Sequence, residues 1–179
     1  MSTKQKKTII RTVRLTRELN AILEKDAELQ RTNFNALISS ILTKYAEWDR
    51  YAERFGHISI PQTLFRAILD LTDENALATL AERLGVELTN EIVSFWFKKT
   101  SEETLLKFLS IVCEYGKAGR FESEVEGRDR TFNIRHDYGK KWSTFLEHYS
   151  DKAIRNYSKV MPQFETTDSA VTVRFRVNP

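Results

Sequence analysis

The sequence predicts an α+β protein in which a strand and two helices precede a mostly helical segment and a small antiparallel sheet. Three observations support this fold class. Residues 9–15 alternate and are rich in β-branched types, apolar residues then recur at helical spacing as far as residue 116, and short alternating runs return from residue 119 onward. Helices followed by segregated antiparallel strands are typical of α+β domains.

The amino-terminal strand is predicted over residues 9–15. One face carries Ile9, Val13 and Leu15, and the other carries Ile10, Thr12 and Arg14. A single short strand with no partner nearby in sequence leaves its backbone donors and acceptors unpaired. We therefore expect a second copy of the chain to pair with it, antiparallel across a twofold axis.

Two amphipathic helices are predicted after the strand. Thr16 can cap the first, at about residues 17–29, in which Leu19, Leu23 and Ala27 form the apolar stripe. Asn33 or Thr32 can cap the second. Its apolar face consists of Leu37, Ile38, Ile41, Leu42, Tyr45, Trp48, Ala52 and Phe55, and Gly56 can terminate it. These elements bury too little surface alone, so we expect two interlocked copies to share one core.

The positive charge of the chain is concentrated at its amino end. Residues 1–60 contain eleven bases and seven acids, whereas residues 61–179 contain seventeen bases and eighteen acids. This asymmetry favours a polyanionic partner for the amino end. A two-stranded ribbon is narrow enough to enter the major groove of double-stranded DNA, where Thr12 and Arg14 would face base edges.

The succession of strand, short helix, turn and capped second helix, with Arg14-Leu15-Thr16 leading into Leu19 and Leu23, resembles the ribbon–helix–helix repressors of the Arc/MetJ type. The resemblance covers residues 8–46 and implies an intertwined homodimer that regulates transcription by sequence-specific DNA binding. By position, the base-reading residues are Ile10, Thr12 and Arg14, and the core residues of the strand are Val13 and Leu15. Phosphate contacts fall on the backbone amides around Asn33, Phe34 and Asn35, at a helix start that favours anions.

Further phosphate contacts are expected from the basic amino end, at Lys4, Lys6, Lys7 and Arg11. The alternative for the three lysines is a solvated extension without a ligand. Two positions depart from the family pattern. Ile10 is apolar where a polar reader is common, although it can pack on a thymine methyl, and Arg31 occupies a turn position that is often glycine.

The remainder of the chain is predicted to form a second domain, residues 56–179, after an amino-terminal module of residues 1–55, and to supply either effector sensing or contacts for a higher oligomer. Helical patterns cover 61–71, 73–85, 89–98 and 102–116, with Gly85 ending the second of these, Thr89 capping the third and Ser101 the fourth. Strands are expected at 119–127 and 130–136, a helix at 138–157, and further strands at 160–164 and 170–177. We expect the 138–157 helix to cover one face of the sheet.

One stretch of the second domain has the features of a binding site, where a strand leads into a helix start. His136, Asp137, Lys140 and Lys141 form a candidate site for a small anionic effector, because helix amino termini bind anions. In the alternative interpretation Asp137 caps the helix and His136 is a hydrogen-bonded polar residue at a strand end. This segment is also similar to the carboxy-terminal half of archaeal ribbon–helix–helix regulators.

The sequence predicts no enzyme, no metal site and no cofactor. It has no Cys-x-x-Cys, no His-Glu-x-x-His and no glycine-rich phosphate loop. A spatial cluster of His136, Asp137 and His148 is the remaining metal or catalytic alternative. The single cysteine, Cys113, lies in an apolar run and is expected to be a buried, inert thiol.

The expected location is the cytoplasm, without a membrane partner, because no apolar run approaches the roughly 18 residues that span a bilayer. The function alternative from another class is a protein-interaction module, such as an antitoxin whose carboxy-terminal part binds a partner protein. A folded second domain argues against it, because antitoxin tails are usually short and disordered.

Overall fold

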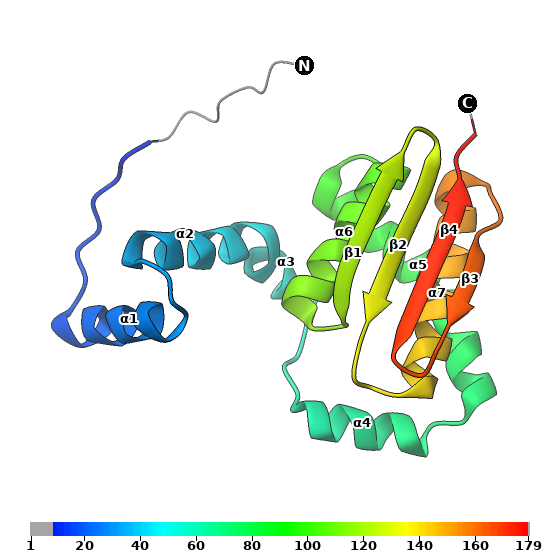
Figure 1. Cartoon of the computed structure of the whole chain (residues 1–179), viewed down its shortest axis with the longest axis horizontal. Coiled ribbons are helices and arrows are strands. Elements are labelled where there is room, and N and C mark those ends of the chain that lie inside the picture. Colours follow the sequence, from blue (N-terminus) through cyan, green and yellow to red (C-terminus); the bar gives the residue numbers. More distant parts are fainter. Residues whose placement is uncertain (1–8, 179) are drawn as a thin grey trace. The chain divides into compact units, whose positions relative to one another are not determined.

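The computed structural model describes residues 9–178 (Figure 1). The chain forms two compact units, Met1–Ala46 and Glu47–Pro179. The first unit contains the helices α1 (Arg17–Leu29) and α2 (Phe34–Lys44). The second contains the remaining helices and a four-stranded sheet. The predicted α+β class is confirmed.

Both helices of the first unit begin where the sequence places them. The Thr16 hydroxyl accepts a hydrogen bond from the Leu19 amide, and the Asn33 side chain accepts one from the Ala36 amide at 2.8 Å. The turn between the helices includes Arg31 in the left-handed region, at φ 51°. Arg31 therefore adopts the backbone conformation that glycine often supplies at such a turn.

Residues 9–16 lie outside any helix or strand of the single chain, so the predicted amino-terminal strand is not formed here. The sheet consists of strands β1 to β4, which all come from the second unit. A strand exists through hydrogen bonds to a neighbouring strand, and residues 9–16 have no such neighbour within this sheet.

The helical run continues beyond α2, as the apolar pattern predicts. A π-helical turn, η1 (Tyr45–Asp49), leads into the short α3 (Arg50–Ala52). Gly56 follows at φ 66°, the left-handed conformation expected of a terminating glycine. The first compact unit therefore ends inside this run.

The second unit has four longer helices: α4 (Gln62–Leu71), α5 (Glu74–Phe97), α6 (Glu102–Gly116) and α7 (Lys140–Ser158). The prediction of separate helices at 73–85 and 89–98 is wrong, because α5 is continuous through Gly85 and Thr89. Gly85 provides close packing: an added Cβ would lie 2.5 Å from the carbonyl oxygen of Tyr149 on α7. The buried Thr89 hydroxyl meets the Tyr149 hydroxyl at 2.5 Å instead of capping a helix.

The sheet has the order β1-β2-β4-β3, and all neighbouring strands are antiparallel. Its strands are β1 (Arg120–Glu126), β2 (Asp129–Arg135), β3 (Gln163–Thr166) and β4 (Ala170–Arg176). The predicted hairpin and the last strand are confirmed to within about a residue, whereas β3 begins three residues after the predicted start at 160. Alternation places Phe132 and Ile134 opposite Val173 and Val171 on one face.

Helices α6 and α7 cover that apolar face, and α5 packs against both of them (Figure 1). The core between the sheet and the two helices is built from Leu105, Leu109, Cys113, Phe132, Ile134, Leu146, Ala153, Ile154, Val171, Val173 and Phe175. The expectation that the 138–157 helix backs the sheet is confirmed. Among the described residues, no helix is long and apolar enough to cross a bilayer.

Candidate functional site

The candidate base-reading residues lie on an exposed segment of the first unit. Ile10, Thr12 and Arg14 are all exposed, and Ile10 retains 88% of its accessible surface. The guanidinium of Arg11 donates to the carbonyl of its neighbour Ile10 at 3.2 Å. The candidate phosphate contacts Lys4, Lys6 and Lys7 lie outside the described residues.

The start of α2 offers backbone donors to an anion. Phe34 and Asn35 occupy its first turn, where amide groups have no acceptor within the helix. The Asn33 side chain fixes this turn by accepting from the Ala36 amide. Asn33 and Asn35 are exposed, so a phosphate oxygen can approach the helix end.

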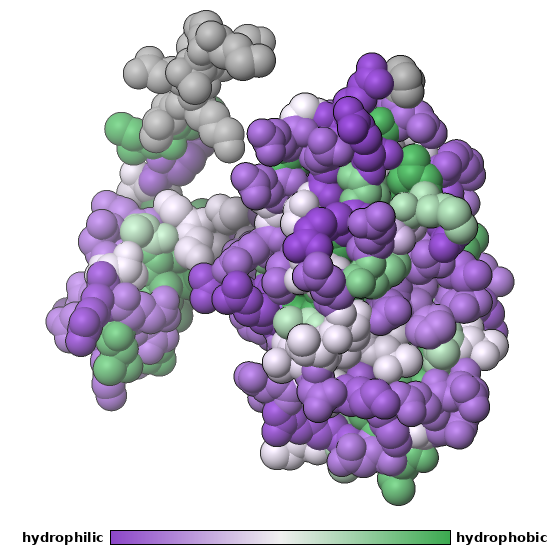
Figure 2. All heavy atoms as spheres, turned by 45° about the vertical axis from the view of Figure 1, so that its right-hand side comes forward, coloured by the Kyte–Doolittle hydropathy of each residue, from purple (hydrophilic) through white to green (hydrophobic). Residues whose placement is uncertain are grey.

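Much of the apolar surface of the first unit is exposed in the single chain. Ala27 of α1 and Leu37 of α2 are buried, at 4% and 7% exposure. The large apolar side chains around them are not covered, as the green spheres on this unit show at the left of Figure 2. The exposed set is Ile9, Ile10, Val13, Leu15, Leu19, Ile22, Leu29, Ile41, Leu42 and Tyr45, with Val13 at 71% and Ile22 at 57%.

Three of the four candidate effector residues, His136, Lys140 and Lys141, have partners within the second unit. His136 is buried at the end of β2, and its Nε2 lies 2.9 Å from the Ser143 hydroxyl. Because Nδ1 accepts from the Tyr138 amide, the proton of the neutral ring belongs on Nε2. Burial lowers the pKa of His136 below its usual 6.5, and the charge of Asp137 partly opposes this. His136 is thus a hydrogen-bonded residue at a strand end, as the alternative interpretation proposes.

Both lysines of the candidate effector site have partners on other helices. The ammonium of Lys141 donates to the carbonyl oxygens of Asp70 at 2.8 Å and Thr72 at 2.7 Å, at the carboxyl end of α4. Lys140 forms an exposed ion pair with Glu74, the first residue of α5, at 3.5 Å. Asp137 makes no cap to α7, which has Gly139 at its N-cap position.

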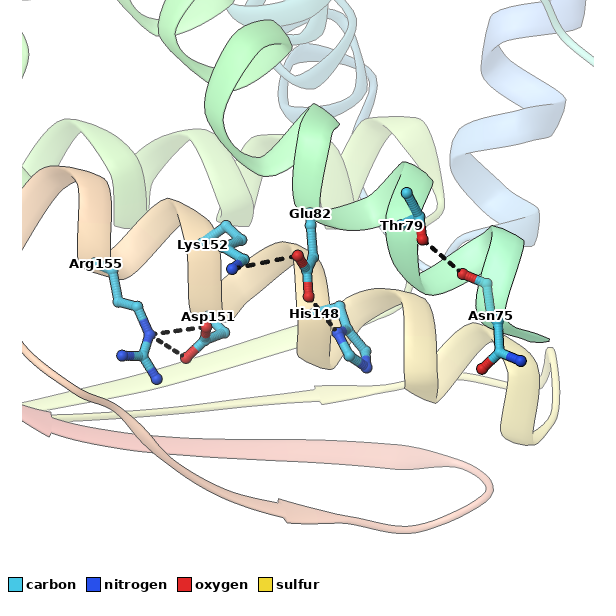
Figure 3. Close-up of polar contacts among 7 residues, drawn as sticks. All are labelled: Asn75, Thr79, Glu82, His148, Asp151, Lys152 and Arg155. Carbon is cyan, nitrogen blue, oxygen red and sulfur yellow. Dashed lines mark hydrogen bonds and ion pairs between the residues drawn. The ribbon is translucent and has the colours of Figure 1, made fainter.

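A polar cluster on the surface between α5 and α7 holds His148 (Figure 3). Its Nδ1 and the Lys152 ammonium contact the two carboxylate oxygens of Glu82, at 3.1 and 3.2 Å. These contacts, with the His148 hydrogen bond contributing most, lower the pKa of Glu82. The described residues contain no group of three or more His, Cys, Asp or Glu that could hold a metal ion. The contact of His148 with Glu82 joins α7 to α5.

The second unit contains a cavity of about 1230 Å³ that the sequence analysis did not identify. Its walls come from α5, α6, the first half of α7, the segment from Trp48 to Phe65 and the residues at 117–120 and 134–138, all within Glu47–Pro179. His136 and Asp137 line it, whereas Lys140 and Lys141 do not. Cys113 also lines it, and burial raises the pKa of its thiol to about 12, as an inert thiol requires.

Many of the apolar and aromatic positions that line this cavity recur at helical spacing. That pattern marks the buried side of a helix but does not tell whether the facing space is filled. Comparison of the chain with protein-family models, with curated proteins and with solved structures found no match. The class of the protein therefore follows from its architecture alone, an α+β unit after an amino-terminal helix pair.

Proposed function

We propose that the protein is a homodimeric, sequence-specific DNA-binding transcription regulator. In this proposal residues 9–15 of two chains pair as an antiparallel ribbon that enters the major groove. Arg14 and Thr12 read base edges, Ile10 packs on a thymine methyl, and Arg11 with the amides of Phe34 and Asn35 contacts phosphates. The basic amino end adds further phosphate contacts by releasing counterions.

The exposed apolar surface of the first unit is the observation that carries this proposal. Val13 and Leu15 alternate on the segment before α1, and Leu19, Ile22, Ile41 and Leu42 on the two helices are also exposed. Burying one such side chain is worth about 1.5–3 kcal/mol, so leaving all of them in water is unfavourable. A second copy brings an identical set of side chains and an identical unpaired segment. One interface between the two copies would therefore bury the apolar side chains and also pair the backbone of residues 9–15.

The positions of the helix caps support the same arrangement. The Thr16 cap starts α1 directly after the segment, and the Asn33 cap starts α2 with Phe34 and Asn35 in its first turn. The ribbon–helix–helix resemblance implies both features. In that arrangement a strand reads the bases, and the start of the second helix binds a phosphate of the DNA backbone.

Selection of DNA fragments from a random pool by the purified full chain tests this function. We expect enrichment of a short site with twofold symmetry, which mirrors the protein dimer. Arg14→Ala should weaken binding to that site by about 1–3 kcal/mol and relax its sequence preference. The matched control is Arg176→Ala on β4, whose side chain is 74% exposed. Absence of any enriched site, or equal effects of the two substitutions, would refute the proposal.

A further inference from the structure

The cavity of the second unit has an unusually aromatic lining. Its eight aromatic side chains are Trp48, Phe65, Phe108, Tyr115, Tyr138, Trp142, Phe145 and Tyr149. Its volume of about 1230 Å³ exceeds the roughly 300–1,000 Å³ of most small-molecule sites, so one organic molecule has room to enter.

Three of these aromatic rings form a stack along α7. Trp142, Phe145 and Tyr149 recur at spacings of three and four residues, which places them on one face of the helix. The rings of Trp142 and Phe145 are 4.7 Å apart and 4° from parallel, and those of Phe145 and Tyr149 are 5.9 Å apart and 17° from parallel. Phe65 meets the Trp142 ring edge-on at 5.1 Å. The stack favours flat rings that can stack on it or meet its edges.

Aliphatic side chains of α5 and α6 supply further wall. Leu84, Leu88 and Ile92 recur every four residues along α5, and Val112 with Cys113 lies on α6. Leu88 remains 38% exposed although it belongs to this lining. An apolar ligand would cover this surface.

The polar atoms of the lining are largely occupied within the protein. The Trp142 indole donates to the Ala118 carbonyl, and the Tyr138 hydroxyl donates to the Lys117 carbonyl, both at 2.8 Å. The Tyr149 hydroxyl is engaged with Thr89. The charged lining residues are three bases and three acids, so the lining does not favour a strongly charged ligand: Lys117, Arg120, Arg135, Asp49, Glu53 and Asp137. Because the Trp142 indole and the two tyrosine hydroxyls already have partners, a ligand of the cavity would gain its affinity mainly from apolar contact area and not from new hydrogen bonds.

We propose that this cavity binds one planar, mainly aromatic small molecule, held against the Trp142–Phe145–Tyr149 stack. This ligand class differs from the anionic effector expected at His136, Asp137, Lys140 and Lys141, of which His136 and Asp137 line the cavity. The inference rests on the second unit alone and is independent of DNA binding by the first.

The test uses the full chain and N-phenyl-1-naphthylamine, an uncharged fused-ring probe whose fluorescence rises in apolar sites. We expect saturable binding with one probe per chain. Leu88→Trp adds a bulky ring to the α5 wall of the cavity and should raise the dissociation constant of the probe about tenfold or more, a change worth about 1.4 kcal/mol or more. Leu88→Ala should leave the cavity open and retain binding.

Leu80→Trp is the matched control, because Leu80 lies on the same helix, is 37% exposed and does not line the cavity. The thermal midpoint of each variant verifies its fold. Loss of binding in Leu88→Trp with retention in Leu80→Trp and Leu88→Ala supports the proposal. Non-saturable binding, or equal binding by the two tryptophan variants, overturns it. Neither result depends on whether the chain binds DNA.

Discussion

Gly85 of α5 faces the carbonyl oxygen of Tyr149 on α7, and a Cβ at position 85 would lie only 2.5 Å from that oxygen. The same hypothetical Cβ would lie 3.2 Å from the Cβ of Lys152. Because the first contact is with backbone, it cannot be relieved by a side-chain rotation. Glycine at this position therefore sets how closely the two helices pack.

We predict that Gly85→Ala destabilises the protein, although alanine is the better helix former. The gain in helix propensity is about 1 kcal/mol, whereas crowding in a packed core typically costs about 1–3 kcal/mol and more where backbone must move. Because this contact is with backbone, the cost lies at the upper end of that range, and urea unfolding should show a net loss of roughly 1–2 kcal/mol. The control is Glu87→Ala at an exposed position of α5, which should change stability by no more than about 0.5 kcal/mol. A Gly85→Ala variant as stable as the wild type would contradict the packing.

We predict that protonation of His136 destabilises the second unit. Burial lowers its pKa below the usual 6.5, so the unfolded chain binds more protons than the folded chain below that pH. The contribution of neutral His136 to the free energy of unfolding is therefore fully present above about pH 6.5. It is lost as the pH falls toward the pKa of the folded state, with a slope of at most about 1.4 kcal/mol per pH unit. Urea titrations at pH 8 and pH 5.5 measure this loss.

His136→Gln is the corresponding variant, and it should reduce stability at pH 8 by about 1–3 kcal/mol, because the bonds to Ser143 and Tyr138 are disturbed. Its stability should then depend less on pH than that of the wild type. His57→Gln is the comparison for the pH dependence of stability. Desolvation also lowers the pKa of His57, but His57 is more exposed than His136. A His136→Gln variant with an unchanged pH slope would show that protonation occurs elsewhere.

We predict that Val13→Glu shifts the chain from dimer to monomer. In the proposed dimer Val13 enters the shared core from both chains, so the substitution removes two apolar contacts worth roughly 3–6 kcal/mol together and adds two buried charges. The dissociation constant of the dimer, from analytical ultracentrifugation, should rise more than about a hundredfold. Val125→Glu is the control, because Val125 is similarly exposed, at 59%, on the edge strand β1. A dimer that survives Val13→Glu unchanged would place the interface elsewhere.

The sequence by itself determined the elements whose signals are local. The caps at Thr16, Asn33 and Ser101 predict the starts of α1, α2 and α6, and the alternation at residues 130–136 and 170–177 predicts β2 and β4 to within a residue. Each signal is a hydrogen bond or a side-chain period within a few residues, so neighbouring sequence suffices to predict it.

Tertiary structure alone decided the features that depend on distant residues. Gly85 predicts a helix end, yet α5 continues because α7 packs against its bare backbone. Lys141 suggests an anion site, yet its charge meets the carbonyls of α4, about seventy residues earlier in the chain. The aromatic face of α7 reads as core, yet part of it borders a cavity. Periodicity reports which side of a helix is apolar, and only the packing of distant elements determines what that side meets.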